Sequence, residues 1–198
     1  MLIELDETTS TNEYIKDLAK SASPSGTVVT AKSQSGGKGR KGRSFNSPVG
    51  GLYLSILWDL KVPGDELAEL TKVSAAAVRR AIVKSFGIEP AIKPINDIYF
   101  KGKKICGILC ESLTFKTSTR SIIGIGINVN TDIKKLPEEV CEIAGSIKEL
   151  TGSEKDLDID FLKNNLIEEL NSLLSDYEKE FAKYKEEYEK WSSLQKQY

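Results

Sequence analysis

The chain has 198 residues, with 28 lysines and arginines against 29 aspartates and glutamates, a formal net charge of −1 and no histidine. This length predicts one domain, with or without an appendage, that buries roughly 70% of its unfolded surface and needs no disulfide. The near-neutral balance gives no overall attraction to nucleic acid or membranes, and the missing histidine excludes Ser-His-Asp and Cys-His catalysis and histidine-ligated zinc.

Cysteine usage and hydropathy indicate the compartment. Three cysteines, an odd number without metal-binding spacing, are typical of a reducing environment. The first ten residues have no basic start and no long apolar stretch, so they do not resemble a signal peptide. No apolar run approaches the ~20 residues that span a bilayer. We therefore expect a soluble, cytoplasmic protein.

Three elements are predicted before residue 35. Residues 2–6 form a short strand, and residues 26–31, rich in β-branched side chains, form a second. Between them, Ser10 and Glu13 have the spacing of a capping box, which predicts a helix that continues to about residue 19.

A glycine-rich basic loop follows the second strand. Residues 35–43 contain four glycines and four cations and no acidic residue. Glycine lets a backbone approach a ligand closely, and successive N–H groups together with Lys and Arg can bind an anion. This pattern predicts either a loop that closes over a phosphate or carboxylate, or a solvated basic loop, or a nucleic-acid contact.

The loop formally contains the G-x-G-x-x-G pattern of dinucleotide-binding proteins over residues 37–42. That interpretation requires a helix directly after the glycines. Here Pro48 and an apolar strand at residues 52–58 follow instead. The strand–loop–strand context, and the missing G-K-[ST] ending, exclude the dinucleotide and Walker interpretations.

The next predicted element is a long amphipathic helix. Asp65 is a candidate N-cap, apolar residues recur at helical spacing from Leu67 to Ile82, and Gly87 is a candidate C-terminal stop. We expect this apolar stripe to belong to the core and to carry no function.

After the stretch 91–100 and a turn at residues 101–103, strands are predicted at residues 104–111 and 121–130. Lys101-Gly102 suits a tight hairpin connection. In the last strand, isoleucine and valine occupy one face, whereas the other face carries only Gly124, Gly126 and Asn128. A glycine face predicts a close neighbour, either a ligand or another backbone, unless it marks a bulge or tight sheet packing. We also expect residues 121–130 to form an exposed edge that could pair two subunits.

From about residue 158 the chain is helical and charged. Apolar residues from Phe161 to Trp191 recur at spacings of three and four, and glutamates interleave with the lysines. This pattern favours an ordinary solvated helix surface over a nucleic-acid contact.

Five short motifs carry a resemblance to one known family. They are Ser10-Thr11-Asn12, the loop 37–43 with Phe45 and the strand 51–55, Lys93-Pro94-Ile95-Asn96-Asp97, the strand 103–109 and the strand 124–128. In this order they resemble the biotin–protein ligases. Two departures are visible: Lys38 replaces the usual first arginine of the loop, which weakens bidentate recognition, and Pro94-Ile95 replaces Trp-Pro.

The resemblance implies an α+β fold in which helices pack on a mixed β-sheet, as in class II aminoacyl-tRNA synthetases. It implies a catalytic domain over residues 1–198, and against the family pattern we expect no N-terminal DNA-binding module and no C-terminal small β-barrel. As partner it implies a biotin carboxyl carrier protein or domain, with neither DNA nor membrane, and the ligase would be a monomer or homodimer.

The implied activity consumes ATP and biotin with Mg²⁺, forms biotinyl-5′-AMP and transfers biotin to a carrier lysine. One alternative is a lipoate–protein ligase, whose typical R-R-x-S-G-G-G element this chain lacks. Another is a biotinyl-adenylate or nucleic-acid binding module without transfer activity.

The resemblance also implies roles for individual residues. The implied catalytic residues are Lys104, Arg40 and Asp97, with Asp97 also the candidate Mg²⁺ ligand. The implied biotin-binding residues are Ser10, Thr11, Gln34, Gly37, Lys38, Arg40, Lys104, Gly107, Gly124 and Gly126. The implied ATP- and adenylate-binding residues are Arg40, Lys41, Arg43, Phe45, Asn96, Asp97, Lys104 and Asn128. Without the flanking motif, Lys104 would be a surface hairpin lysine, and we expect Cys106 and Cys110 to be structural.

Overall fold

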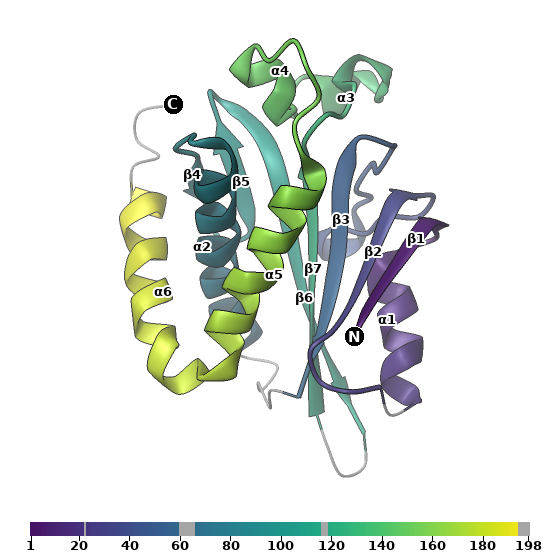
Figure 1. Ribbon diagram of the computed structural model, residues 1–198, viewed down its shortest axis with the longest axis vertical. Helices are drawn as coiled ribbons and strands as arrows, with labels where there is room; N and C mark the ends of the chain where they lie inside the picture. Colours follow the sequence, from purple (N-terminus) through teal and green to yellow (C-terminus); the bar gives the residue numbers. More distant parts are fainter. Residues whose placement is uncertain (22, 60–65, 116–118, 194–198) are drawn as a thin grey trace.

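The structure is a computed structural model that describes residues 1–21, 23–59, 66–115 and 119–193. A seven-stranded sheet with the order β1-β2-β3-β7-β6-β5-β4 runs through it (Figure 1). Strand β1 pairs with β2 in parallel and all other pairs are antiparallel, so the predicted mixed sheet is confirmed. The strands are β1 Leu2–Thr8, β2 Thr27–Gln34, β3 Gly51–Trp58, β4 Ala91–Lys93, β5 Asp97–Phe100, β6 Lys103–Thr114 and β7 Thr119–Asn128.

The helices surround this sheet. They are α1 Thr11–Lys20, α2 Leu67–Phe86, α3 Glu138–Cys141, α4 Ile147–Thr151, α5 Ile159–Ser175 and α6 Tyr177–Ser193, with short 3-10 turns η1 Arg40–Gly42 and η3 Ile133–Lys135. Gly87 ends α2 in the left-handed conformation, as its sequence predicts. The proposed N-cap Asp65 lies outside the described residues. No helix in the described part of the chain is long and apolar enough to span a membrane.

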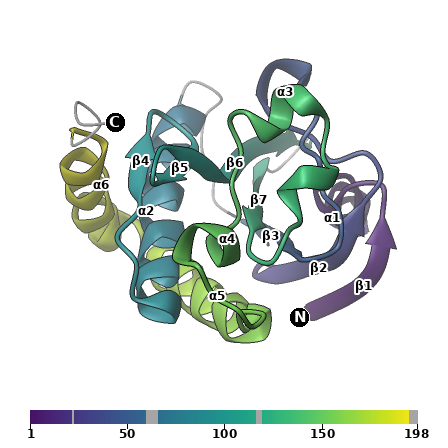
Figure 2. The same ribbon diagram turned by 90° about the horizontal axis from the view of Figure 1, so that it is seen from above.

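The two faces of the sheet are covered differently. Helices α2, α5 and α6 lie on one face and α1 on the other, which is clear when the molecule is viewed from above (Figure 2). Strand β7 shows the division, because Ile123, Ile125 and Ile127 belong to the large core on the α2 face. On the other face, Ile122 packs with Ile15 of α1 in a smaller cluster.

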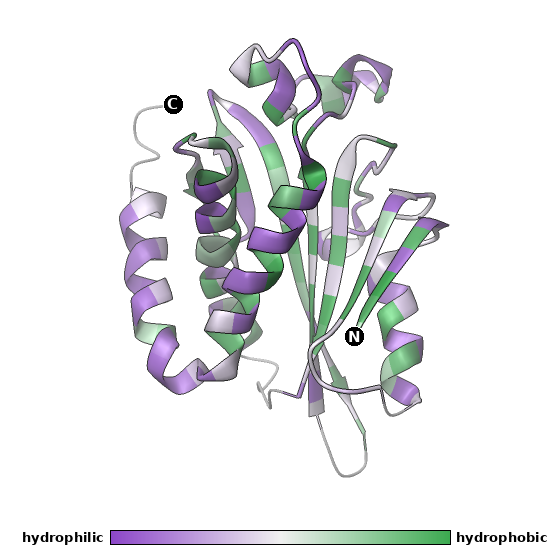
Figure 3. Ribbon diagram, in the orientation of Figure 1, coloured by the Kyte–Doolittle hydropathy of each residue, from purple (hydrophilic) through white to green (hydrophobic). Residues whose placement is uncertain are grey.

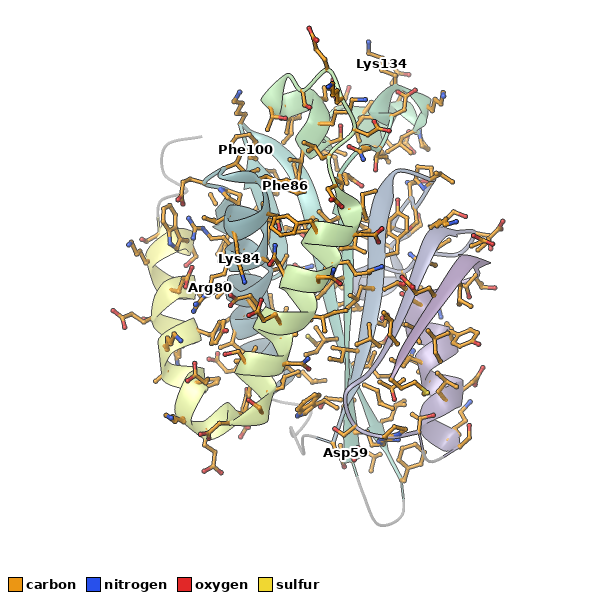
Figure 4. The ribbon with its side chains drawn as sticks, in the orientation of Figure 1. Asp59, Arg80, Lys84, Phe86, Phe100 and Lys134 are labelled. Carbon is orange, nitrogen blue, oxygen red and sulfur yellow. The ribbon has the colours of Figure 1, made fainter. Side chains whose placement is uncertain are left out.

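The outer helices agree with their charge pattern. Helices α5 and α6 are separated at Asp176 and form an antiparallel pair whose outer sides are hydrophilic (Figure 3). Two side chains of α2, Arg80 and Lys84, point toward these helices (Figure 4), where they pair with Glu169 and Glu168 of α5. In α6 the buried side chains are Tyr184 and Tyr188, so the predicted solvated helix surface is confirmed.

Two local predictions have different outcomes. The hairpin at Lys101-Gly102 is confirmed, because both residues have positive φ (47° and 76°) between β5 and β6. The capping box is wrong: Ser10 is the N-cap residue of α1, but its side chain accepts no capping hydrogen bond. Glu13 instead forms ion pairs with Lys16 and Lys38.

The expectation of an exposed edge over residues 121–130 is also wrong. Strand β7 lies between β3 and β6 and is hydrogen-bonded to both, whereas β1 and β4 are the outer strands. A strand at the centre of a sheet has no free backbone groups for a second subunit. The prediction failed because the residue pattern of one strand does not show which other strands it pairs with.

Candidate active site

A cavity of about 540 Å³ opens on the α1 face of the sheet, a size typical of small-molecule sites. Its lining comes from α1, the loop after β2, the β4–β5–β6 hairpins, β7 and the segment before α4. Fourteen residues expected in the site line it: Ser10, Thr11, Gln34, Lys38, Arg40, Lys41, Arg43, Phe45, Asn96, Asp97, Lys104, Gly107, Gly124 and Gly126.

The glycine-rich loop folds back on itself above this cavity. The amide of Gly39 donates to the carbonyl of Arg43 (2.7 Å), and the amide of Phe45 donates to the carbonyl of Gly37 (2.8 Å). Lys41 and Gly42 both have positive φ at the tip (57° and 73°). The loop connects strand β2 to strand β3. The helix that a dinucleotide-binding loop needs directly after its glycines is therefore absent from this fully described segment, as the sequence predicts.

The charged groups converge from different elements. Arg40 donates from Nη1 to Oδ1 of Asn96 (3.1 Å), and Asn96 donates from Nδ2 to the carbonyl of Ile108 (3.1 Å). The Nζ of Lys104 lies 2.8 Å from Oδ1 of Asp97, so the two form an ion pair. Arg40, Asn96 and Asp97, which the sequence places up to 57 positions apart, thus border one cavity.

Cations dominate the lining of this cavity. Lys38, Arg40, Lys41, Arg43, Lys93 and Lys104 contribute six positive charges, and Asp97 is the one carboxylate among the described lining residues. The chain as a whole has a net charge of −1. The local excess therefore creates a field that attracts anionic ligands.

Beside these charges lies a polar network at the start of α1. The amide of Thr11 donates to Oε1 of Gln34 (2.8 Å), whose Nε2 donates to the hydroxyl of Ser47 (2.8 Å). The hydroxyl of Ser47 donates to the carbonyl of Phe45 (2.9 Å), so the network reaches the residues that follow the tip of the loop. Because its groups bond one another, this wall can hold a polar ligand with little rearrangement.

The glycine face of β7 meets side chains. A Cβ at Gly124 would overlap the amide of Asn12, and a Cβ at Gly126 would overlap the ring of Phe45. The same ring stands against Gly107 of β6. We expected a ligand or another backbone as the neighbour of this face; within the cavity, the side chains of Asn12 and Phe45 are the neighbours. The bulge interpretation is wrong, since β7 pairs regularly across both glycines.

Two expected site residues lie elsewhere. Gly37 is buried within the loop, where a Cβ would overlap the carbonyl of Phe45 and the hydroxyl of Ser47, and it does not line the cavity. Asn128 is buried and donates to the carbonyl of Gly145 (3.3 Å), while its Oδ1 has no hydrogen-bond partner among the described atoms. Their roles in binding stay predictions.

Ten lining residues were not assigned from the sequence, among them Asn12, Lys93, Tyr99 and Ile143. Asn12 and Lys93 stand inside motifs that were recognised, so those motifs could have identified them. Tyr99 and Ile143 also line the cavity. Ile143 is a half-exposed apolar residue in a segment without a recognised motif, and only its position beside Lys104 brings it to the site.

The cysteines take no part in the cavity lining. Burial raises the pKa of the Cys106 thiol, and burial likewise raises the pKa of Cys110 to about 11. Thiolates are the reactive form of cysteine. Both residues are therefore inert at neutral pH, in agreement with the structural role expected for them.

Comparison with solved structures identifies the fold. The structure resembles the biotin protein ligase from Aquifex aeolicus in complex with biotin and ATP, with a TM-score of 0.81, 34% sequence identity, and coverage of 94% of this chain and 76% of that one. It also resembles the ligase from Leishmania major in complex with biotinyl-5-AMP (TM-score 0.73, 25% identity, 88% and 75% coverage). The fold is that of biotin protein ligase catalytic domains, as the sequence motifs imply.

The family follows from the sequence comparisons. The model of the biotin/lipoate A/B protein ligase family matches residues 3–128, so the chain belongs to this family. The bifunctional ligase/repressor BirA of Bacillus subtilis is 38% identical over 157 residues, which are 78% of this chain and 48% of that protein. BirA of Escherichia coli is 33% identical over 172 residues, 86% and 52% respectively. The chain thus spans about half the length of the curated relatives it matches.

Proposed function

We propose that this chain activates biotin with ATP to form biotinyl-5′-AMP and then transfers the biotinyl group to a lysine of a biotin carboxyl carrier protein or domain. The observation that carries the proposal is the cavity in which six cations and one carboxylate converge. The similarity to ligases solved with biotin and ATP, or with biotinyl-5-AMP, supports it further.

The charge of the cavity suits the first step. A biotin carboxylate attacks the α-phosphorus of ATP and pyrophosphate leaves, so two anions must be brought together. Positive groups held in advance around the reacting atoms lower the cost of this approach and stabilise charge in the transition state. In the proposal, Lys104 contacts both the carboxylate and the α-phosphate, and Arg40 and Arg43 contact the phosphates.

The remaining assignments follow the cavity lining, except those of Gly37 and Asn128, which lie outside it. Ser10, Thr11 and Gln34 would bind biotin beside Gly107, Gly124 and Gly126, and the loop residues Gly37, Lys38 and Lys41 would enclose the ligand. Phe45, Asn96 and Asn128 would contact the adenylate, with the orphaned Oδ1 of Asn128 as an acceptor for it. The loop over the cavity would keep water from the mixed anhydride.

Mg²⁺ fits these residues as an ion shared with phosphates. No cluster of three or more acidic or cysteine side chains in the described ranges could hold a metal by itself. Mg²⁺ is commonly bound through one or two carboxylates together with substrate phosphates and water. Asp97 would hold the ion beside Asn96, and the ion would offset phosphate charge. Without it, Asp97 pairs with Lys104 and orients that amine.

The second step needs an incoming amine. A carrier lysine attacks the carbonyl carbon of the anhydride, the amide bond forms, and AMP leaves with the bond electrons. We propose that this takes place in the cytoplasm, where ATP is available and free thiols such as those of the three cysteines persist. DNA has no part in the proposal, and the ligase would act as a monomer or homodimer.

An adenylation assay tests the proposal. The protein is mixed with ATP, Mg²⁺ and radiolabelled biotin or lipoate, and the acyl-adenylate is separated by chromatography; a biotin carboxyl carrier domain is then added. We expect biotinyl-5′-AMP and a labelled carrier, and no reaction with lipoate. Labelling with lipoate alone would replace the substrate assignment, and adenylate without a labelled carrier would leave only the activation step.

A further inference from the structure

A row of four alternating charges joins the basic loop to the sheet through α1. Glu111 of β6 pairs with Lys16 (2.7 Å), Lys16 pairs with Glu13 (2.7 Å), and Glu13 pairs with Lys38 of the loop (2.9 Å). Lys16 and Lys38 approach the same oxygen of Glu13, Oε1. The row begins in the sheet and ends at the loop's first cation.

The inner part of this row is firmly held. Asn12 donates from Nδ2 to Oε2 of Glu111 (2.8 Å), and its Oδ1 accepts from the buried hydroxyl of Ser55 (2.5 Å). The side chain of Lys16 is 19% exposed, so its two carboxylate partners are only partly screened by water. The hydrogen bond from Lys16 lowers the pKa of Glu13 most, and the one from Lys38 lowers it further, so Glu13 is ionised at neutral pH.

The loop is thus fastened to the first turn of α1 on both sides of its tip. Before the tip of the loop, Lys38 pairs with Glu13. After the tip, Ser47 is hydrogen-bonded to Gln34, which in turn accepts from the amide of Thr11. The residues after the tip of the loop are held by uncharged hydrogen bonds. The residues before the tip are held by the Lys38–Glu13 ion pair and by backbone hydrogen bonds from Ser35 to the carbonyl of Thr8 (3.0 Å) and from Gly36 to the carbonyl of Thr9 (2.8 Å). Between these two parts of the loop, Lys41 and Arg43 have no ion-pair partner among the described residues and stay exposed.

We propose that Glu13 is a positioning residue that latches Lys38 to α1 and so holds the basic loop over the cavity. The inference deepens the proposed function and rests on it, because this is the loop assigned to the adenylate. A lysine amine is a single point charge that lacks the fork of an arginine. A fixed carboxylate beside it supplies an orientation that the side chain itself does not have.

Trypsin cleavage measures this latch without reference to activity. Trypsin cuts after Arg40, Lys41 and Arg43 only when the loop leaves its folded position, so the cleavage rate reports loop opening. Glu13→Gln keeps the size of the side chain and removes its charge. We expect cleavage after Arg40, followed by mass spectrometry, to become about threefold faster, within the range that an exposed ion pair provides. Lys38→Gln should accelerate the same cleavage equally.

The matched control is Asp17→Asn. Asp17 lies on the same helix, and among the described residues its carboxylate pairs only with Lys20 three residues later, so its loss should leave the cleavage rate unchanged. The double variant Glu13→Gln with Lys38→Gln should be cleaved no faster than either single variant, since both remove one interaction. Cleavage of Glu13→Gln at the wild-type rate, or a fully additive double variant, would overturn the latch.

Adenylate retention gives the functional readout. Release of biotinyl-5′-AMP from Glu13→Gln should be about threefold faster, again the range of an exposed ion pair, whereas Asp17→Asn should release it at the wild-type rate. An unchanged release rate in a variant with faster cleavage would confine Glu13 to the free enzyme and overturn its role in holding the ligand. A wild-type protein that forms no adenylate would defeat the proposed function, while the cleavage rates would still decide the latch.

Discussion

The two faces of the sheet differ in what their side chains do: one is packed as a hydrophobic core, and the other carries a polar cavity. The face under α2, α5 and α6 is a continuous apolar core, in which Leu70, Ile125 and Leu166 are almost completely removed from water. The face under α1 has a small apolar cluster around Ile15 at one end and, at the other, a cavity with polar and charged walls.

The difference shows how one sheet serves stability and binding together. Burial of apolar side chains on the helix side provides the main favourable free energy of folding. The α1 side can then keep glycines and unneutralised cations, which contribute little to stability or reduce it. Within β7 this division alternates residue by residue, and each substitution below perturbs one face of the sheet.

The largest expected effect comes from the helix face. Leu166→Ala removes a fully buried side chain of α5, and we expect it to lower the free energy of unfolding by about 2–5 kcal/mol, measured by urea denaturation. Ile15→Ala, in the smaller cluster under α1, should cost less because neighbouring half-exposed residues can relax into the space. An equal or greater cost at Ile15 would break the comparison.

On the cavity face, Lys104→Ala should act on chemistry. Loss of a positive charge beside the reacting groups should slow single-turnover adenylation by on the order of 100-fold or more, with little change in the free energy of unfolding. Lys84→Ala on the helix face, where the amine pairs with Glu168, is the control and should adenylate biotin at the wild-type rate. If Lys104→Ala were as fast as the wild type, Lys104 would be an ordinary surface lysine of its hairpin.

A graded test addresses the glycine face. A Cβ at Gly126 would overlap the ring of Phe45, whereas a Cβ at Gly107 would stand 3.2 Å from that ring. Gly126→Ala should displace Phe45 and slow adenylation about tenfold, a barrier increase of roughly 1.4 kcal/mol. Gly107→Ala should have a smaller effect. The reverse order would mean that Phe45 does not act through its contact with β7.

The smallest expected effect concerns the thiols of Cys106 and Cys110. Because burial raises the pKa of Cys110 to about 11, its thiolate fraction at pH 8 is far below that of an exposed cysteine, and its alkylation by iodoacetamide should accelerate as pH rises toward 11. Cys106, deeper in the core, should react still more slowly, and both should react quickly in guanidinium chloride. Fast alkylation of Cys110 in the native protein would show that the core around it opens readily.

Local patterns predicted much of the fold. The alternation in β7, the left-handed stop at Gly87 and the Lys101-Gly102 hairpin were all read correctly, because each depends on residues a few positions apart. The position of β7 at the centre of the sheet was not, because strand order depends on which distant segments pair. The capping box failed for a related reason, since Lys38 lies 25 positions from Glu13 and binds it instead.

The sequence by itself determined most of the long elements, the family and the residue types of the site, because motifs and periodicity are local and survive without a structure. Only the tertiary structure decided that Asn12 and Phe45 cover the glycine face, that Gly37 and Asn128 lie outside the cavity lining, and that Glu13 pairs with Lys38 of the loop. These are contacts between segments far apart in the chain. Their geometry depends on how α1, the loop and the sheet pack together, and no single stretch of sequence contains that information.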